Sequence, residues 1–358
     1  MNSKRFIKIL ALAAASSIAL SFAACSKTES TGAVTSETLT ESAPTSEETE
    51  ETTETATEPS ETHKPVITAD DITITEEMDN SNDSEHALEI SGEEASYSGI
   101  KVTKTGDSGE GDKADFYGDN AAVFATDGAT LTLTNIIVDT DGTHANAVFS
   151  YGEGTTVNIS DSVITTDGNC SGGLMTTGGG TMNADNLNIH TTGNSSAAIR
   201  SDRGGGTVNV TGGLYVTDGK GSPAIYSTAD ITVSDATLES TVSEGVVVEG
   251  KNSVTLNNVS LTADNNAHNS NKSENYKAVM IYQSMSGDAA EGDASFTMNG
   301  GSLTNKNGDV FFVNNTVADI NLSNAAITNL DTSGAPSISV LASIIITAVG
   351  MPACPFFT

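Results

Sequence analysis

Apolar and polar residues alternate along this chain in eight similar units. Each unit reads apolar, any residue, apolar, four residues, apolar, as in Leu131, Leu133 and Val138. Successive units start 26, 25, 26, 23, 23, 42 and 24 residues apart. The starts are Leu131, Val157, Met182, Val208, Ile231, Val254, Phe296 and Ile320. Alternation is the period of a strand, and repeats at this interval indicate a solenoid that buries its apolar faces by stacking. We predict an all-β fold, a parallel β-helix of about eight to ten coils.

Most units carry another short strand before this core. The strands are centred on Val123, Val148, Leu174, Ile199, Ile225 and Val247. If the first five central residues point inward, the next residue of each strand lies on the outer face. These outer residues, which we call the outer column, are Phe124, Phe149, Met175, Arg200 and Tyr226. An exposed stripe of aromatic side chains and arginine would suit glycan binding. Two alternatives are that loops cover the column or that the strands have the opposite register.

The turns between units contain Asp-Gly pairs, as in Asp141-Gly142, Asp167-Gly168 and Asp218-Gly219. Glycine adopts positive φ at no steric cost and aspartate bonds its own backbone, so we expect these pairs to serve as turns. Less regular alternating segments begin near Ile72 in an acidic stretch, as expected of a capping region. We place the β-helix at residues 66–334.

The N-terminal residues 1–24 combine Lys4, Arg5 and Lys8 with an apolar stretch and small residues before Cys25. This pattern is typical of a secretory signal, and Phe22-Ala23-Ala24-Cys25 resembles a bacterial lipobox, which would make Cys25 the lipidated N-terminus. Residues 25–65 are mostly Ser, Thr, Glu, Ala and Pro, so we expect a disordered tether. The protein is then expected outside the cell, anchored to the outer face of the membrane through Cys25.

The last segment, residues 335–358, differs in composition from the repeats. It loses Asn and Asp, keeps only Gly350 among its glycines, and carries an apolar run from Ile338 to Met351. A genuine terminal cap is one interpretation. The other is an aberrant tail produced by a frameshift or a truncated gene.

The chain has 47 Asp and Glu against 15 Lys and Arg, a formal net charge of −32. Such a surface argues against nucleic acid as a partner.

With Cys25 lipidated, only Cys170 and Cys354 remain, so disulfides do not hold the fold. The histidines His63, His86, His144, His190 and His268 show no metal-ligand spacing along the chain, and no calcium-binding nonapeptide is present. We therefore assign no catalytic residues, no metal ligands and no cofactor. Calcium stays open as an alternative because the surface is acidic, although no motif supports it.

Arg200 and Arg203 are the only arginines that would survive signal cleavage. Guanidinium groups bind carboxylates in two-point contacts, including those of uronic acids. The alternative is that both arginines pair with Asp202 or with acids on adjacent turns. The candidate ligand-binding residues are Phe149, Met175, Arg200, Arg203 and Tyr226.

Two runs carry a resemblance to a known group: Ala198-Ile199-Arg200-Ser201-Asp202-Arg203 and Ser222-Pro223-Ala224-Ile225-Tyr226-Ser227. From Ile72 to Ser333 the chain resembles secreted lipoproteins of anaerobic Gram-positive bacteria, largely uncharacterised. It is more broadly similar to right-handed parallel β-helices of the pectate-lyase-like class and to adhesins. This resemblance implies a right-handed β-helix and an extracellular location, with adhesion or glycan contact by analogy.

The function expected from these features is non-catalytic adhesion to, or binding of, an extracellular polysaccharide or host surface. One alternative is a carbohydrate-active enzyme, either a polysaccharide lyase or a glycoside hydrolase, although no paired carboxylates are identifiable in the sequence. Another is a passive surface stalk. The Thr and Asn pairs that flank the second strand, such as Thr156-x-Asn158 and Thr181-x-Asn183, leave ice binding as a further alternative.

Overall fold

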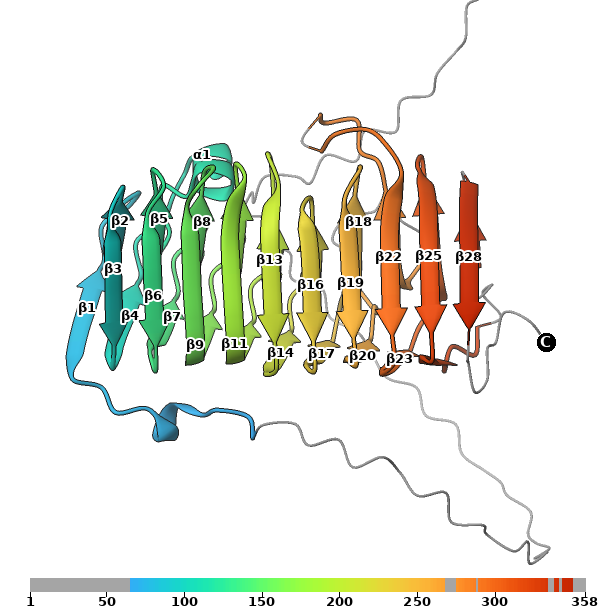
Figure 1. Cartoon of the computed structure of the whole chain (residues 1–358), viewed down its shortest axis with the longest axis horizontal. Helices are drawn as coiled ribbons and strands as arrows, with labels where there is room; N and C mark the ends of the chain where they lie inside the picture. The colour runs from blue at the N-terminus through green and yellow to red at the C-terminus, as the bar shows by residue number, and fades with distance from the viewer. Residues whose placement is uncertain (1–64, 268–274, 288, 334–337, 341–342, 350–358) are drawn as a thin grey trace, which may run out of the picture.

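Parallel strands stacked from one turn of the chain to the next make up nearly all of the structure (Figure 1). The computed structural model describes residues 65–267, 275–287, 289–333, 338–340 and 343–349. Every strand pair in it is parallel, within an 18-stranded and a 10-stranded sheet. The all-β prediction is confirmed, and the topology is that of a β-solenoid. The expected signal (residues 1–24), Cys25 and nearly all of the expected tether lie outside the described residues.

The larger sheet forms two of the three faces. We call the first the flat face. Its strands are β3 (Glu94–Ser98), β6 (Thr130–Thr134), β9 (Thr156–Thr166), β11 (Gly180–Thr191), β13 (Gly206–Thr211), β16 (Asp230–Ser234), β19 (Ser253–Asn257), β22 (Ala294–Asn299), β25 (Val317–Ser323) and β28 (Ser343–Val349). The second face has β1 (Glu76–Asn80), β4 (Ile100–Lys104), β7 (Ile137–Thr140), the ends of β9 and β11, β14 (Leu214–Thr217), β17 (Thr237–Ser240), β20 (Ser260–Ala263), β23 (Ser302–Asn305) and β26 (Ala326–Asn329).

The smaller sheet forms the third face. Its strands are β2 (Leu88–Ser91), β5 (Val123–Thr126), β8 (Val148–Tyr151), β10 (Leu174–Thr177), β12 (Ile199–Ser201), β15 (Ile225–Ser227), β18 (Val246–Glu249), β21 (Lys277–Tyr282), β24 (Asp309–Asn314) and β27 (Ile338–Val340). Two short helices complete the described elements, the 3-10 helix η1 (Ala69–Asp71) and α1 (Gly111–Tyr117).

The register of the sheets follows the sequence repeat. Leu131 pairs with Val157, and Val157 with Met182, so equivalent apolar positions of successive units stack on one another. The 42-residue step leaves this register intact, because Val254 still pairs with Phe296. These columns fill one continuous core. The core forms because alternation sends every second side chain of each strand inward.

A polar ladder lies inside the corner between the second and third faces. Thr166 Oγ1 donates to the carbonyl oxygen of Ser171 at 2.7 Å, and Thr191 repeats the contact with Ser196 at 2.6 Å. The backbone N–H of Ser171 in turn donates to Ser196 Oγ of the next coil at 2.9 Å. Buried hydroxyls therefore satisfy the turn carbonyls and join neighbouring coils.

The described part of the C-terminal segment continues the stack. β27 pairs in parallel with β24, and β28 pairs with β25 from Val317 to Ser323. The apolar run from Ile338 thus supplies strands to both sheets. Among the described residues, no helix has the length and apolar character needed to cross a membrane.

Candidate functional site

The outer column has the predicted register on the third face. Phe124 pairs with Phe149, Phe149 with Met175, and Met175 with Arg200, which is followed by Tyr226. The expectation that this column is exposed is wrong, because Phe149 and Met175 are fully buried. An exposed binding surface made of these five side chains is therefore not what the third face presents.

Helix α1 and the residues that follow it cover part of the column. The helix belongs to the segment between β4 and β5 and lies against the third face near β5 and β8 (Figure 1). The carbonyl oxygen of Phe116 accepts a 2.7 Å hydrogen bond from Thr177 Oγ1, and a Cβ built on Gly118 would lie 2.5 Å from the Phe124 ring. The guanidinium of Arg203 lies 3.9 Å from the centre of the Phe116 ring. Exposure of apolar side chains to water is unfavourable, so cover by α1 stabilises the apolar part of the column.

Arg200 is committed to internal carboxylates. Its Nη2 lies 2.8 Å from Asp202 Oδ2 and 3.6 Å from Asp115 Oδ2, and its side chain is 12% exposed. Burial alone would lower the pKa of Arg200, but Asp115 and Asp202 together raise it. The structure therefore agrees with the alternative interpretation, in which Arg200 pairs with acidic side chains of the protein and not with a ligand.

Tyr226 is held in a similar way. Its hydroxyl donates to Glu249 Oε2, and the hydroxyl of Tyr282 donates to the same oxygen at 2.8 Å. Burial raises the pKa of Tyr226 and of Tyr282 well above the usual value. Both phenols therefore stay neutral donors that solvate a buried carboxylate. The sequence did not indicate Glu249 and Tyr282, because they lie two residues beyond the outer column, at the next outward-facing position of β18 and β21.

Asp202 gives this cluster a pH dependence. Burial raises its pKa to about 6, against the opposing effect of Arg200. The unfolded value is about 3.9, so between about pH 4 and 6 the folded state holds a proton that the unfolded chain has released. Stability from this group is therefore full below about pH 4 and is lost as the pH rises through 6.

We expect the wild type to lose on the order of 2 kcal/mol relative to Asp202→Asn between about pH 4 and 6. The measurement is urea unfolding of both proteins at steps of pH. Glu153→Gln, an exposed isosteric replacement, serves as the control. Parallel stability curves for wild type and Asp202→Asn would contradict this assignment.

Three potential metal ligands meet beneath α1. His144 Nδ1 lies 3.0 Å from Asp115 Oδ1, and one donor atom each of Asp115, His144 and Cys170 lies within 4.8 Å of the other two. His144 and Cys170 are both buried. The histidines have no metal-ligand spacing along the chain, so the sequence did not indicate this cluster. In a solenoid the relevant spacing is one coil, and His144 and Cys170 are the fourth residues of two equivalent turns that begin at Asp141 and Asp167.

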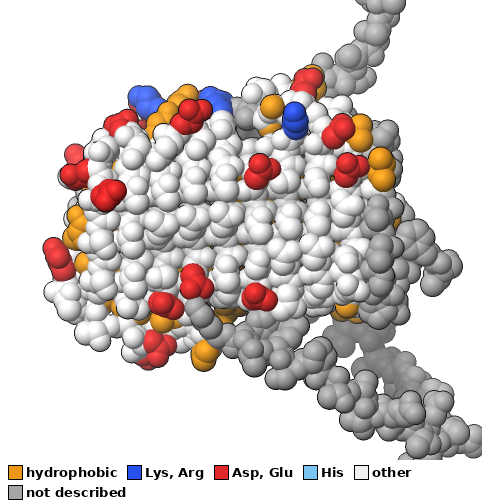
Figure 2. Space-filling model, in the orientation of Figure 1, with side chains coloured by type: hydrophobic (Ala, Val, Ile, Leu, Met, Phe, Trp, Pro, Cys, Tyr) orange, Lys and Arg blue, Asp and Glu red, His pale blue; other side chains and the backbone are white. Residues whose placement is uncertain are grey.

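The flat face, unlike the covered part of the third face, presents a broad row of side chains on the outside of the solenoid. Its central row consists of neutral polar side chains in register. They are Ser96, Thr132, Asn158, Asn183, Asn209, Thr232, Thr255, Thr297 and Asn321. Figure 2 shows uncharged atoms over most of this face. In the central row and the two rows beside it, the described outward positions include no lysine or arginine and four carboxylates, those of Glu94, Asp185, Asp230 and Asp319.

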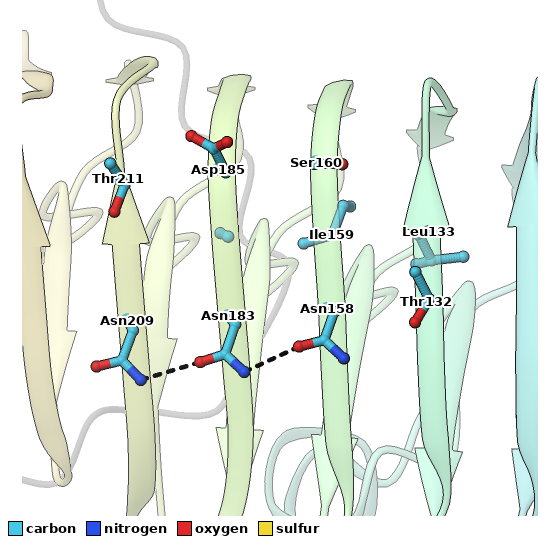
Figure 3. Close-up of a pocket in the computed structure, with 10 residues that line it drawn as sticks. Thr132, Leu133, Asn158, Ile159, Ser160, Asn183, Asp185, Asn209 and Thr211 are labelled. Atoms are coloured by element: carbon cyan, nitrogen blue, oxygen red, sulfur yellow. Dashed lines mark hydrogen bonds between the residues drawn. The ribbon is translucent and has the colours of Figure 1, made fainter.

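An asparagine ladder follows part of the central row. Asn209 Nδ2 donates to Asn183 Oδ1 at 2.9 Å, and Asn183 Nδ2 donates to Asn158 Oδ1 at 2.9 Å (Figure 3). A groove of about 310 Å³ runs beside the ladder, bounded on its other side by Asp185 and Thr211. The ladder bonds fix the amides in one orientation. Each amide keeps a second N–H and a second lone pair for a ligand.

Comparison of the chain with models of protein families, with curated proteins and with solved structures found no match. The function is therefore inferred from the chemistry of these surfaces.

Proposed function

We propose that this protein is a cell-surface lipoprotein that binds a neutral polysaccharide, without catalysis, through its flat face. In this proposal Cys25 carries the lipid anchor, the tether spaces the domain from the outer face of the membrane, and the solenoid is a right-handed β-helix. The observation that carries the proposal is the central row with its asparagine ladder and groove. It offers a straight array of oriented hydrogen-bond donors and acceptors that a chain of hydroxyl groups can follow.

The repeat of this array suits a polymer. Neighbouring strands place equivalent side chains about 4.8 Å apart. A side chain that can both donate and accept a hydrogen bond therefore recurs at every coil of the central row, as a bonded amide on three consecutive coils and as a hydroxyl or amide on the others. A polysaccharide likewise presents the same hydroxyls at regular intervals. The scarcity of charge along the row favours a neutral glycan, and the overall charge of −32 disfavours an acidic one.

The distribution of carboxylates supports binding over hydrolysis. Glycoside hydrolases use two carboxyl groups that flank one bond, usually separated by about 5–10 Å. Asp185 belongs to β11 and Asp230 to β16, with β13 between them and in opposite outer rows; Glu94 and Asp319 lie on still more distant strands. None of these four described carboxylates has another of them on an adjacent coil of the flat face.

The test is co-sedimentation of the purified protein with insoluble cellulose, chitin and xylan, with polygalacturonate as the acidic comparison. Replacing Asn158, Asn183 and Asn209 together by Ala should weaken binding at least roughly tenfold, because each lost hydrogen bond contributes about 0.5–1.5 kcal/mol. The matched control replaces Thr165, Thr262 and Thr304 of the second face by Ala, which should leave binding unchanged.

Three outcomes would contradict the proposal. Binding that survives the asparagine replacements but is lost in a folded Arg200→Ala variant would return the site to the third face. Unsaturated or newly reducing sugar products would favour the carbohydrate-active enzyme. Failure to bind any of these glycans would favour the passive stalk.

A further inference from the structure

The three side chains gathered at α1 form a donor set that is characteristic of one type of metal ion. They offer a thiol sulfur, an imidazole nitrogen and a carboxylate oxygen. Calcium and magnesium take oxygen ligands, whereas zinc is bound by cysteine, histidine and carboxylate groups together. We propose that Asp115, His144 and Cys170 bind one zinc ion that fastens α1 to the solenoid.

The distances fit a small shift into tetrahedral coordination. Zinc–ligand bonds of about 2.0–2.3 Å place pairs of ligand atoms roughly 3–4 Å apart. His144 Nδ1 and Asp115 Oδ1 already lie 3.0 Å apart, and all three donor atoms lie within 4.8 Å of one another. Three protein ligands leave a fourth position for water.

The backbone holds two of the ligands in fixed places. The N–H of His144 donates to the carbonyl oxygen of Asn169, and that of Cys170 donates to Asn194, both at 2.8 Å. Both residues adopt positive φ, 59° for His144 and 57° for Cys170. Equivalent turn positions on successive coils therefore present the imidazole and the thiol one above the other, and α1 adds the carboxylate from outside the stack.

The surrounding charges balance when zinc is bound. Zinc contributes +2, while ionised Asp115 and the Cys170 thiolate contribute −1 each. Arg200 lies 3.6 Å from Asp115 and would repel a cation, but Asp202 pairs with Arg200 at 2.8 Å and neutralises it. The five groups and the ion thus sum to zero, which a buried site requires.

The role assigned to the ion follows from the size of α1. The helix spans seven residues, too few to be stable without tertiary contacts. Thr177 and Arg203 hold it at Phe116. Zinc coordination through Asp115 would add an attachment one residue away, and it would keep the buried part of the outer column covered.

Cobalt and zinc test the site directly. The purified chain is used with Cys25→Ser and Cys354→Ser, so that Cys170 is its sole cysteine. After treatment with a chelator, CoCl2 should bind at one equivalent with a thiolate-to-cobalt charge-transfer band, and ZnCl2 should remove that band. Cys170→Ser should abolish the band. It should also weaken zinc binding by at least the roughly 10–100-fold that follows loss of an outer-shell partner.

The control is His190→Ala. His190 Nε2 lies 2.6 Å from Asp218 Oδ2, so this exposed pair offers an imidazole and a carboxylate without a thiol. Binding should be unchanged in this variant and weakened in Asp115→Asn. Circular dichroism of every variant establishes that it is folded.

Zinc should also slow alkylation of Cys170 by iodoacetamide in the protein with Cys25→Ser and Cys354→Ser. Three results would overturn the proposal: cobalt spectra without a thiolate band, zinc affinity unaffected in folded Cys170→Ser, or alkylation at the same rate with and without ZnCl2. Fast alkylation that zinc does not slow would instead indicate an activated thiol beside His144.

Discussion

Gly168→Ala is expected to destabilise the protein by more than roughly 3 kcal/mol, because the added methyl group has no space. A Cβ at this position would lie 2.0 Å from the carbonyl oxygen of Gly142 and 2.6 Å from its carbonyl carbon. Both atoms belong to the backbone of the preceding coil. They cannot move without separating two coils whose hydrogen bonds continue on either side.

The same contact recurs along the stack. A Cβ on Gly142 would lie 2.1 Å from the carbonyl oxygen of Gly106, one on Gly193 would lie 1.9 Å from that of Gly168, and one on Gly219 would lie 1.8 Å from that of Gly193. Gly109→Ala is the matched control, because a Cβ there meets no atom within 4 Å. Urea unfolding should separate the two variants clearly. Equal stability of Gly168→Ala and Gly109→Ala would show that the coils can move apart at little cost.

This glycine column also corrects the reasoning from the sequence. The Asp-Gly pairs were expected to supply positive φ, yet Gly142, Gly168 and Gly219 do not adopt it. Positive φ falls two residues later in each turn, at His144, Cys170 and Gly221. A glycine can be required because its backbone has positive φ or because another backbone approaches too closely for a Cβ. An Asp-Gly pair looks the same in both cases, so the sequence alone could not separate the two requirements.

The apolar interior was predictable because it depends on local geometry. Alternation fixes which side chains of a strand point inward, and the repeat spacing fixes which of them stack, so Leu131, Val157 and Met182 could be aligned without coordinates. The outer column was aligned by the same reasoning. Cover by a loop was one of the two alternatives, but the pattern could not decide for it, because α1, which covers part of the column, has no α-helical counterpart among the described residues of the other units.

The ligand cluster shows the same limit. His144 and Cys170 occupy equivalent turn positions 26 residues apart, and a comparison of turns by coil would have paired them. Asp115 could not have been added, because its segment carries no repeat that could place it against a particular coil. For the flat face, the sequence identified the Thr and Asn pairs but not the ladder that orients their amides, since side-chain hydrogen bonds depend on the final stacking.

The second large effect is expected from Ile199→Asp. Ile199 is completely buried, and its strand neighbours in the inward column are Leu174 and Ile225. Burial of an unpaired carboxylate among aliphatic side chains belongs to the class of substitutions that cost more than about 4 kcal/mol. Because each coil of a solenoid is stabilised by its neighbours, the loss should extend to several coils.

We expect thermal unfolding of Ile199→Asp, followed by circular dichroism, to occur roughly 10 °C or more below that of the wild type. Ile199→Val is the matched control and should cost only about 0.5–1.5 kcal/mol, because it removes one methyl group and adds no charge. An unchanged Tm for Ile199→Asp would mean that this position is not part of a packed interior. The side chains of β12 would then have the opposite inward and outward assignment. The register that places the outer column and the zinc site would be wrong as well.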